Sequence, residues 1–128
     1  MRLAPLAVAA LLSLGAGSAR ASAPRDHLRI VVWPHGLAAT PRAARTLTCY
    51  PAGGTLPGAA GACRRLAALA RPFAPVPAGV MCSQIVSGPQ AALVTGSYGG
   101  RRIWARFRRT DSCQTERWNR IAFLFPTG

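Results

Sequence analysis

The residues of this 128-residue chain that could most clearly take part in chemistry are four cysteines: Cys49, Cys63, Cys82 and Cys113. They could bind zinc, act as nucleophiles or form disulfides. Structural zinc sites usually contain close pairs such as Cys-x-x-Cys. The sequence has no such pair, and His27 and His35 lie far from every cysteine. An even number of cysteines in a small exported chain predicts two disulfides, with three possible pairings. Pairing of neighbours would close loops of about 15 and 32 residues, each worth about 3 kcal/mol.

The other polar residues do not form a recognisable catalytic set. The chain has two histidines and three acidic residues, and it lacks a Gly-x-Ser-x-Gly turn and a phosphate-binding glycine loop. Cysteines held in disulfides cannot serve as thiolate nucleophiles. We therefore expect no enzyme activity, no catalytic residues, no cofactor and no metal.

The N-terminus has the layout of a secretory signal peptide. A charged start, Met1-Arg2, precedes an apolar run from Leu3 to Leu14, and Ala19-Arg20-Ala21 supplies a small-residue cleavage site. The apolar run is too short for a membrane anchor, since about 20 residues are needed to span a bilayer. We expect residues 1–21 to be removed and residues 22–128 to form a single secreted, extracellular domain.

The chain is strongly basic, with a formal net charge of +13 and arginine at all sixteen basic positions. Such a charge favours acidic surfaces and nucleic acids. The arginines are scattered along the chain, however, and motifs that read bases are absent. We interpret them as a solvated basic surface and expect no specific nucleic-acid partner.

The elements that must position these residues are mostly strands, and the pattern predicts an α+β fold. Apolar residues alternate in Leu28–Trp33, Arg45–Tyr50 is a second short strand, and Ile121–Phe125 is an apolar closing strand. Ala91–Tyr98 and Arg101–Arg109 flank Gly99-Gly100 and predict a hairpin. In its second strand, Ile103, Ala105 and Phe107 should face opposite to Arg102, Trp104, Arg106 and Arg108.

Two short helices are expected between these strands. Thr55 is the predicted cap of the first, in which Ala59, Cys63, Leu66 and Ala70 share one face before Pro72 ends it. The second covers Asp111–Trp118, with Asp111 or Ser112 as its cap. We interpret the apolar face of the first helix as core packing.

The segment Val80–Pro89 allows two interpretations. It is apolar, contains Cys82, and lies between a Pro- and Gly-rich connector and Pro89. It could be a buried edge strand fixed by its cysteine. Alternatively, it could be an exposed, extended loop, which a protease cleft would bind at a small cost in ordering entropy.

The sequence resembles the bacterial subtilisin inhibitors of the Streptomyces type. The resemblance extends from about Leu28 to Phe125. It rests on these sequence motifs: Thr46-Leu47-Thr48-Cys49, Pro51-Ala52-Gly53-Gly54-Thr55, Ala62-Cys63-x-x-Leu66-Ala67, Val80-Met81-Cys82, Val94-Thr95-Gly96, Tyr98-x-Gly100-Arg101-Arg102 and Ala122-Phe123-Leu124-Phe125.

The resemblance implies a five-stranded antiparallel β-sheet with two short α-helices. It also implies the disulfides Cys49–Cys63 and Cys82–Cys113, and a homodimer joined through its sheets. The implied activity is inhibition of secreted, subtilisin-like serine proteases.

Carried onto this chain, the family's reactive bond is Gln84–Ile85, with Gln84 as the specificity residue. The implied protease-binding loop consists of Met81, Cys82, Ser83, Gln84, Ile85 and Val86. The stretch from Cys82 to Pro89 is one residue longer than is usual in the family, so Ile85 is the alternative specificity residue. The longer loop could also be cleaved as a substrate.

Two residues of the loop also depart from the family pattern. Ser83 stands where a more rigid residue, usually proline, is expected. Gln84 replaces the usual methionine, lysine or arginine. Because its amide is uncharged, we expect no strong inhibition of trypsin-like enzymes, whose specificity pocket is acidic.

A second hypothesis is a basic extracellular binding protein on the same scaffold, with weak or no protease inhibition. It rests on residues of the predicted hairpin: Tyr98, Arg101, Arg102, Trp104, Arg106, Arg108 and Arg109. Arginines beside aromatic residues can bind phosphate or acidic polymers. The preferred interpretation is that Trp104 packs at the dimer face while the arginines are solvated.

Overall fold

The computed structural model describes residues 1–5, 7, 9–13, 15, 17 and 23–126. The expected cleavage site at residues 19–21 lies outside these residues, so the signal peptide stays a prediction. In the described part of the chain, no helix is long and apolar enough to cross a membrane.

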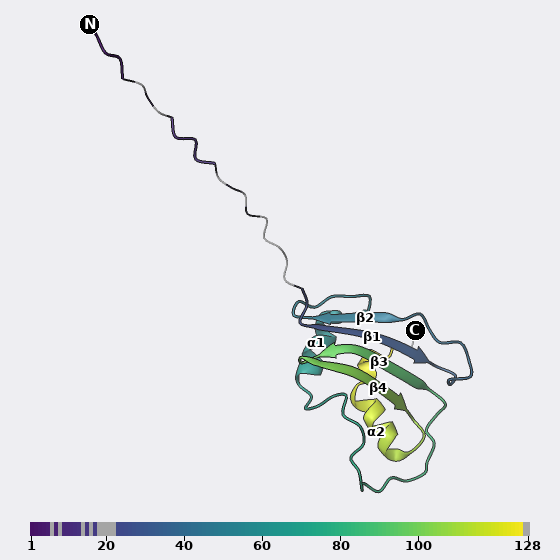
Figure 1. Ribbon diagram of the computed structural model, residues 1–128. Helices are drawn as coiled ribbons and strands as arrows, with labels where there is room; N and C mark the ends of the chain where they lie inside the picture. Colours follow the sequence, from purple (N-terminus) through teal and green to yellow (C-terminus); the bar gives the residue numbers. More distant parts are fainter. Residues whose placement is uncertain (6, 8, 14, 16, 18–22, 127–128) are drawn as a thin grey trace.

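Four antiparallel strands form one sheet in the described residues (Figure 1): β1 (Asp26–Trp33), β2 (Arg45–Cys49), β3 (Ala91–Tyr98) and β4 (Arg101–Arg108). Their order across the sheet is β2-β1-β3-β4. β3 and β4 form the predicted hairpin, in which Tyr98 pairs with Arg101 across Gly99-Gly100. Both turn glycines have positive φ, 57° and 76°, as the commonest two-residue hairpin turn requires.

The fifth strand predicted for Ile121–Phe125 is not found in the described chain, and that assignment was wrong. After α2 (Ser112–Arg120), the chain forms a 3-10 turn, η1 (Ala122–Leu124). The amides of Leu124 and Phe125 donate locally to the carbonyls of Ile121 and Ala122 at 2.9 Å. A short apolar run does not by itself distinguish a strand from a buried helical turn.

The helix α1 (Ala59–Ala67) is shorter than expected and has a different cap. Gly58, with φ 69°, precedes it, and Thr55 does not cap it. The Thr55 hydroxyl instead accepts the Thr46 amide at 2.9 Å, while the Thr55 amide donates to the Thr46 hydroxyl at 3.1 Å. These bonds tie the loop before α1 to β2. Ala70, predicted on the helix face, lies beyond the helix end and is exposed.

The core lies between one face of the sheet and the helical elements. Leu28 pairs with Leu47 and Ile30 with Val94 across the strands, and all four are at most 1% exposed. The helices and the C-terminal turn contribute Leu66, Trp118, Ile121, Leu124 and Phe125. The disulfide Cys49–Cys63 joins β2 to α1. This core holds α2 in place, with the Trp118 and Phe125 rings 4.5 Å apart.

The opposite face of the sheet, called here the outer face, is not part of this core. Arg29 on β1 and Arg102, Trp104 and Arg106 on β4 are exposed there. Their neighbours on the same strands point inward, as the predicted alternation requires.

Candidate functional site

Residues 80–90 form an extended segment without regular structure between the proline-rich connector and β3. Its apolar side chains lie in solvent: Met81 is 96% exposed, Ile85 68% and Val86 65%. These exposures exclude the buried-edge-strand interpretation. The segment is an exposed loop, which we call the presented loop.

One side of the presented loop is fixed to the start of α2. Cys82 is joined to Cys113 by a disulfide, the pairing that the resemblance implies. Next to it, the Ser83 amide donates to the Ser112 hydroxyl at 2.8 Å, and the Ser112 amide donates to the Ser83 carbonyl at 3.0 Å. Ser83 therefore directs both of its main-chain polar groups toward the scaffold.

The other side of the loop is fixed to the end of β4. The Ser87 amide donates to the Arg109 carbonyl at 2.8 Å. The Arg109 guanidinium donates through Nη1 to the Gln90 side-chain oxygen at 3.2 Å. A Cβ at Gly88 would approach that oxygen to 2.1 Å. Glycine at this position therefore lets the loop pass close to the Arg109–Gln90 pair.

The three residues between the two attachments are Gln84, Ile85 and Val86. Within the described chain, no hydrogen bond joins their main-chain groups to the scaffold. In the part of the chain that the structure describes, the hydrogen bond of this short stretch is a long one within the loop, from the Gln84 side-chain amide to the Cys82 carbonyl at 3.5 Å. The loop is thus held at Ser83 and Ser87 and presents the residues between them to solvent.

The helix that holds the loop is itself fixed by Arg117. Its Nε donates to the Ala74 carbonyl at 2.8 Å, and its Nη1 donates to the Arg106 carbonyl. The guanidinium also lies 4.0 Å from the centre of the Phe107 ring. Burial lowers the pKa of Arg117 from its ordinary value. One side chain therefore links α2 to β4 and to the connector before the loop.

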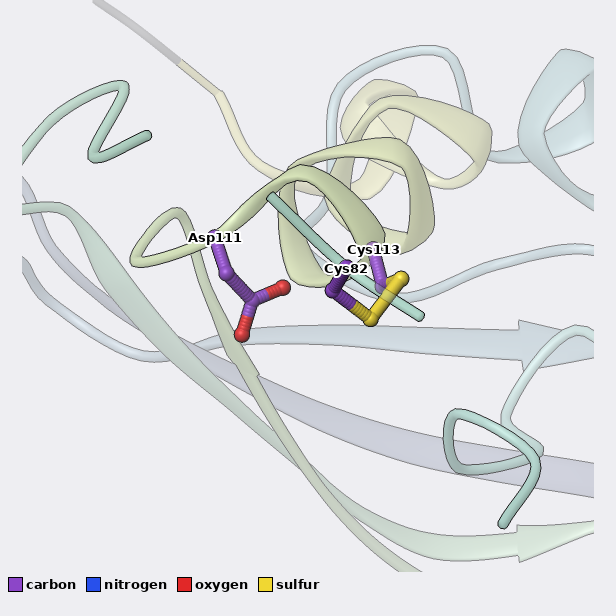
Figure 2. A group of neighbouring side chains, drawn as sticks. All are labelled: Cys82, Asp111 and Cys113. Carbon is purple, nitrogen blue, oxygen red and sulfur yellow. A yellow bond between two sulfur atoms is a disulfide. The ribbon is translucent and has the colours of Figure 1, made fainter. Parts of the chain in front are cut away.

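Cys82, Asp111 and Cys113 come within 4.8 Å of one another at the start of α2 (Figure 2). The two sulfur atoms are bonded to each other, so neither is available as a thiolate ligand. Asp111, one of the two caps that the sequence allowed, caps α2 by accepting the Gln114 amide at 2.8 Å. The cluster is therefore an attachment point of the loop, and its donor set does not suit a metal ion.

Sequence reasoning missed three residues that contact or support the loop: Arg109, Ser112 and Arg117. Ser112 was considered only as a helix cap, although it adjoins Cys113 and so had to lie near Cys82 once that disulfide was assumed. Arg109 and Arg117 gave no such signal, because their partners at Gln90 and Ala74 are distant in sequence.

The sequence of residues 26–111 matches the model of the subtilisin inhibitor-like family. This match includes all four strands and the whole presented loop. The chain belongs to the subtilisin inhibitor-like family. Because that family consists of inhibitors, the prediction that this chain is not an enzyme is confirmed.

Among solved structures, the chain is similar to Streptomyces caespitosus sermetstatin, determined in complex with Bacillus licheniformis subtilisin. The identity is 24%, and the TM-score is 0.46, over 75% of this chain and 96% of that chain. No curated protein sequence matches the chain significantly.

Proposed function

We propose that this subtilisin inhibitor-like protein inhibits subtilisin-like serine proteases through the presented loop, with Gln84–Ile85 as the reactive bond. The observation that carries the proposal is the attachment of Ser83 and Ser87 to the scaffold on either side of three exposed residues. A loop already held in an extended form loses little conformational entropy when a protease binds it.

The hydrogen bonds of Ser83 favour Gln84 over Ile85 as the specificity residue. In an extended strand, main-chain groups of successive residues point alternately to opposite sides. Because those of Ser83 bind Ser112, we infer that those of Cys82 and Gln84 are directed outward. A protease strand that pairs with the loop would then bond to Cys82 and Gln84. With Ile85 as the specificity residue, this pairing would require groups of Ser83 that are already engaged.

In the proposed mechanism, the protease serine attacks the carbonyl carbon of Gln84. The bond to the Ile85 nitrogen breaks, Gln84 becomes the acyl group on the serine, and the Ile85 nitrogen takes up a proton as an amine. The chain is then in two pieces, but Cys82–Cys113 still joins them and Ser87 still holds the leaving side. The amine stays near the acyl group, so the bond can reform in competition with hydrolysis.

The uncharged side chain of Gln84 sets the expected target range. It can enter a broad, largely apolar specificity pocket, but it cannot pair with an acidic pocket as a cation does. We therefore propose subtilisin-like enzymes as targets and expect weak inhibition of trypsin-like ones.

The reactive bond can be identified by incubating the purified, disulfide-bonded protein with a catalytic amount of subtilisin. After reduction, mass spectrometry should find a single early cut between Gln84 and Ile85. An early cut after Ile85 would move the specificity residue by one position, and a first cut outside residues 81–86 would contradict the proposed loop.

Secretion and dimerisation are further parts of the proposal. We propose that residues 1–21 are removed during export, which N-terminal sequencing of secreted material would test. A homodimer through the outer faces would bring the arginines of two copies together. We therefore expect any dimer to strengthen as salt concentration rises, and light scattering at low and high salt measures this directly.

A further inference from the structure

The presented loop contains an oxidisable side chain whose chemistry the proposed mechanism does not use. The sequence has two methionines, Met1 and Met81, and Met1 lies in the expected signal peptide. Met81 is therefore the one methionine of the proposed mature chain. Its side chain is 96% exposed, so a small oxidant can reach the thioether sulfur from solvent.

The other sulfur atoms of the domain offer little competition for an oxidant. All four cysteines are joined in disulfides, and none is free. A disulfide has no thiolate, which is the form of cysteine that peroxides attack. Met81 therefore carries the sulfur atom that is most readily oxidised in the folded domain.

Met81 is held close to the proposed reactive bond. Its carbonyl oxygen lies 3.8 Å from the sulfur of Cys113, and the next residue forms the disulfide Cys82–Cys113 (Figure 2). In an extended chain each residue adds about 3.3 Å, which places Met81 about 10 Å from Gln84. A standard protein–protein interface covers about 800 Å² of each partner. A protease bound at Gln84 would therefore also cover Met81.

The surroundings of Met81 suit an apolar contact. Val80, Ile85 and Val86 are also at least half exposed, at 50%, 68% and 65%. Together with Met81 they give the loop a set of apolar side chains in solvent, as interaction sites often have. A bound protease would remove these side chains from water, so burial of the thioether would contribute to affinity.

We propose that Met81 is an oxidation site that switches the inhibitor off. This inference rests on the proposed function, because it acts through the contact of the presented loop with a protease. The oxidant is hydrogen peroxide. The sulfur gives an electron pair to one peroxide oxygen, the O–O bond breaks, and the other oxygen leaves as water. The product is methionine sulfoxide, in which the sulfur has lost two electrons.

The sulfoxide should weaken binding and leave the fold intact. In the free protein the added oxygen stays in water, because the side chain of Met81 is almost fully exposed. In the complex the sulfoxide would lose its hydration. Burial of a polar group without a hydrogen bond is unfavourable, so we expect the inhibition constant to rise about tenfold. A methionine sulfoxide reductase, with a dithiol as the reductant, should restore both the thioether and the inhibition.

The test compares inhibition of subtilisin by the purified, disulfide-bonded protein before and after mild treatment with hydrogen peroxide. Peptide mass spectrometry should locate one added oxygen atom at Met81. The inhibition constant should then rise about tenfold, while the thermal unfolding midpoint stays within a few degrees. An unchanged constant with Met81 fully oxidised would overturn the inference but leave the proposed function standing. Absence of inhibition before treatment would instead overturn the proposed function, and this inference with it.

Two variants at the same position separate the sulfoxide from other oxidation products. Met81→Leu cannot form a sulfoxide, so peroxide should leave its inhibition constant unchanged, whatever the starting value. Met81→Gln carries a polar side chain of similar length and should inhibit about tenfold more weakly than Met81→Leu without any peroxide. Loss of inhibition by peroxide-treated Met81→Leu would assign the effect to another residue, such as the exposed Trp104, and overturn the inference. Reductase treatment that removes the oxygen without restoring inhibition would overturn it as well.

Discussion

At the residue scale, the account depends most on Gln84. Its side chain is the group that would enter the specificity pocket, and we infer that its main-chain groups are directed outward from the hydrogen bonds of Ser83 to Ser112. From the residues alone, the segment around Cys82 could be either a buried edge strand or an exposed loop, and only the resemblance to the inhibitor family favoured the loop. The position of the reactive bond within the loop could not be derived from the residues alone. The direction of the Ser83 main-chain groups depends on Ser112, a partner 29 residues away.

We predict that Gln84→Arg creates a trypsin inhibitor. A cation at this position can pair with the acidic specificity pocket of trypsin, so inhibition of trypsin should improve at least a hundredfold. The measurement is the inhibition constant against active-site-titrated trypsin. The matched variant Ile85→Arg should not improve; if it improves more than Gln84→Arg, the specificity residue is Ile85.

Ser112→Ala tests the attachment on the acyl side of the bond. The substitution removes the acceptor of the Ser83 amide, and one such hydrogen bond is worth about 1 kcal/mol. We expect subtilisin to cleave this variant several-fold faster at Gln84–Ile85, because the loop is less firmly held. The rate of cleavage is followed by chromatography. Ser87→Ala is the control, since its main-chain bond to Arg109 persists, and equal acceleration in both variants would refute a special role for Ser112.

At the scale of elements, α2 connects the presented loop to the rest of the fold. Its first residues bind the loop, its apolar side packs on Phe125, and Arg117 links it to β4 and the connector. The helix could be predicted from the sequence, which left its cap open between Asp111 and Ser112. The C-terminal turn was wrongly predicted as a fifth strand, because the pattern of Ile121–Phe125 shows burial but not the backbone geometry that achieves it.

Arg117→Met should destabilise the fold more than Arg120→Met. Arg117 satisfies two carbonyls and packs on a ring, whereas Arg120 is exposed and donates to the Ala70 carbonyl at 3.1 Å. Leaving a partly buried carbonyl without its charged donor costs about 2 kcal/mol. Thermal unfolding should show a lower midpoint for Arg117→Met by several degrees. Equal midpoints for the two variants would mean that the Arg117 contacts contribute little.

Gly96 on the central strand β3 is a second structural constraint. Its φ is 129°, and a Cβ there would approach the His27 carbonyl oxygen on β1 to 2.0 Å. Gly96→Ala therefore strains the backbone and separates two paired strands, at a cost of about 2 kcal/mol or more. Denaturant unfolding would measure this loss. Gly99→Ala is the comparison, since its positive φ is also unfavourable for alanine but no atom lies within 4 Å of the added Cβ.

At the scale of the whole molecule, the two disulfides have different expected roles. Cys49–Cys63 joins a strand to a helix within the scaffold, whereas Cys82–Cys113 joins the two pieces that cleavage of Gln84–Ile85 would produce. The sequence predicted two disulfides from the number of cysteines and left three pairings open. The spatial proximity that selects between them is a property of the folded chain.

Removing Cys82–Cys113 by Cys82→Ser/Cys113→Ser should turn the inhibitor into a substrate. The control is Cys49→Ser/Cys63→Ser, which removes the other disulfide. Each disulfide contributes about 3 kcal/mol to stability in the chain-entropy model, so both double variants should unfold at lower temperature. Only the Cys82/Cys113 variant should release its cleaved pieces and restore protease activity over time. Lasting inhibition by this variant would contradict the proposed role of the disulfide in religation.

The most direct test of the central claim is a titration of active-site-calibrated subtilisin with the purified, oxidised protein, followed by residual activity on a small peptide substrate. The account predicts a sharp loss of activity that ends near one inhibitor site per protease molecule and persists on standing. Undiminished activity, or a brief loss that recovers as the added protein is consumed, would contradict it.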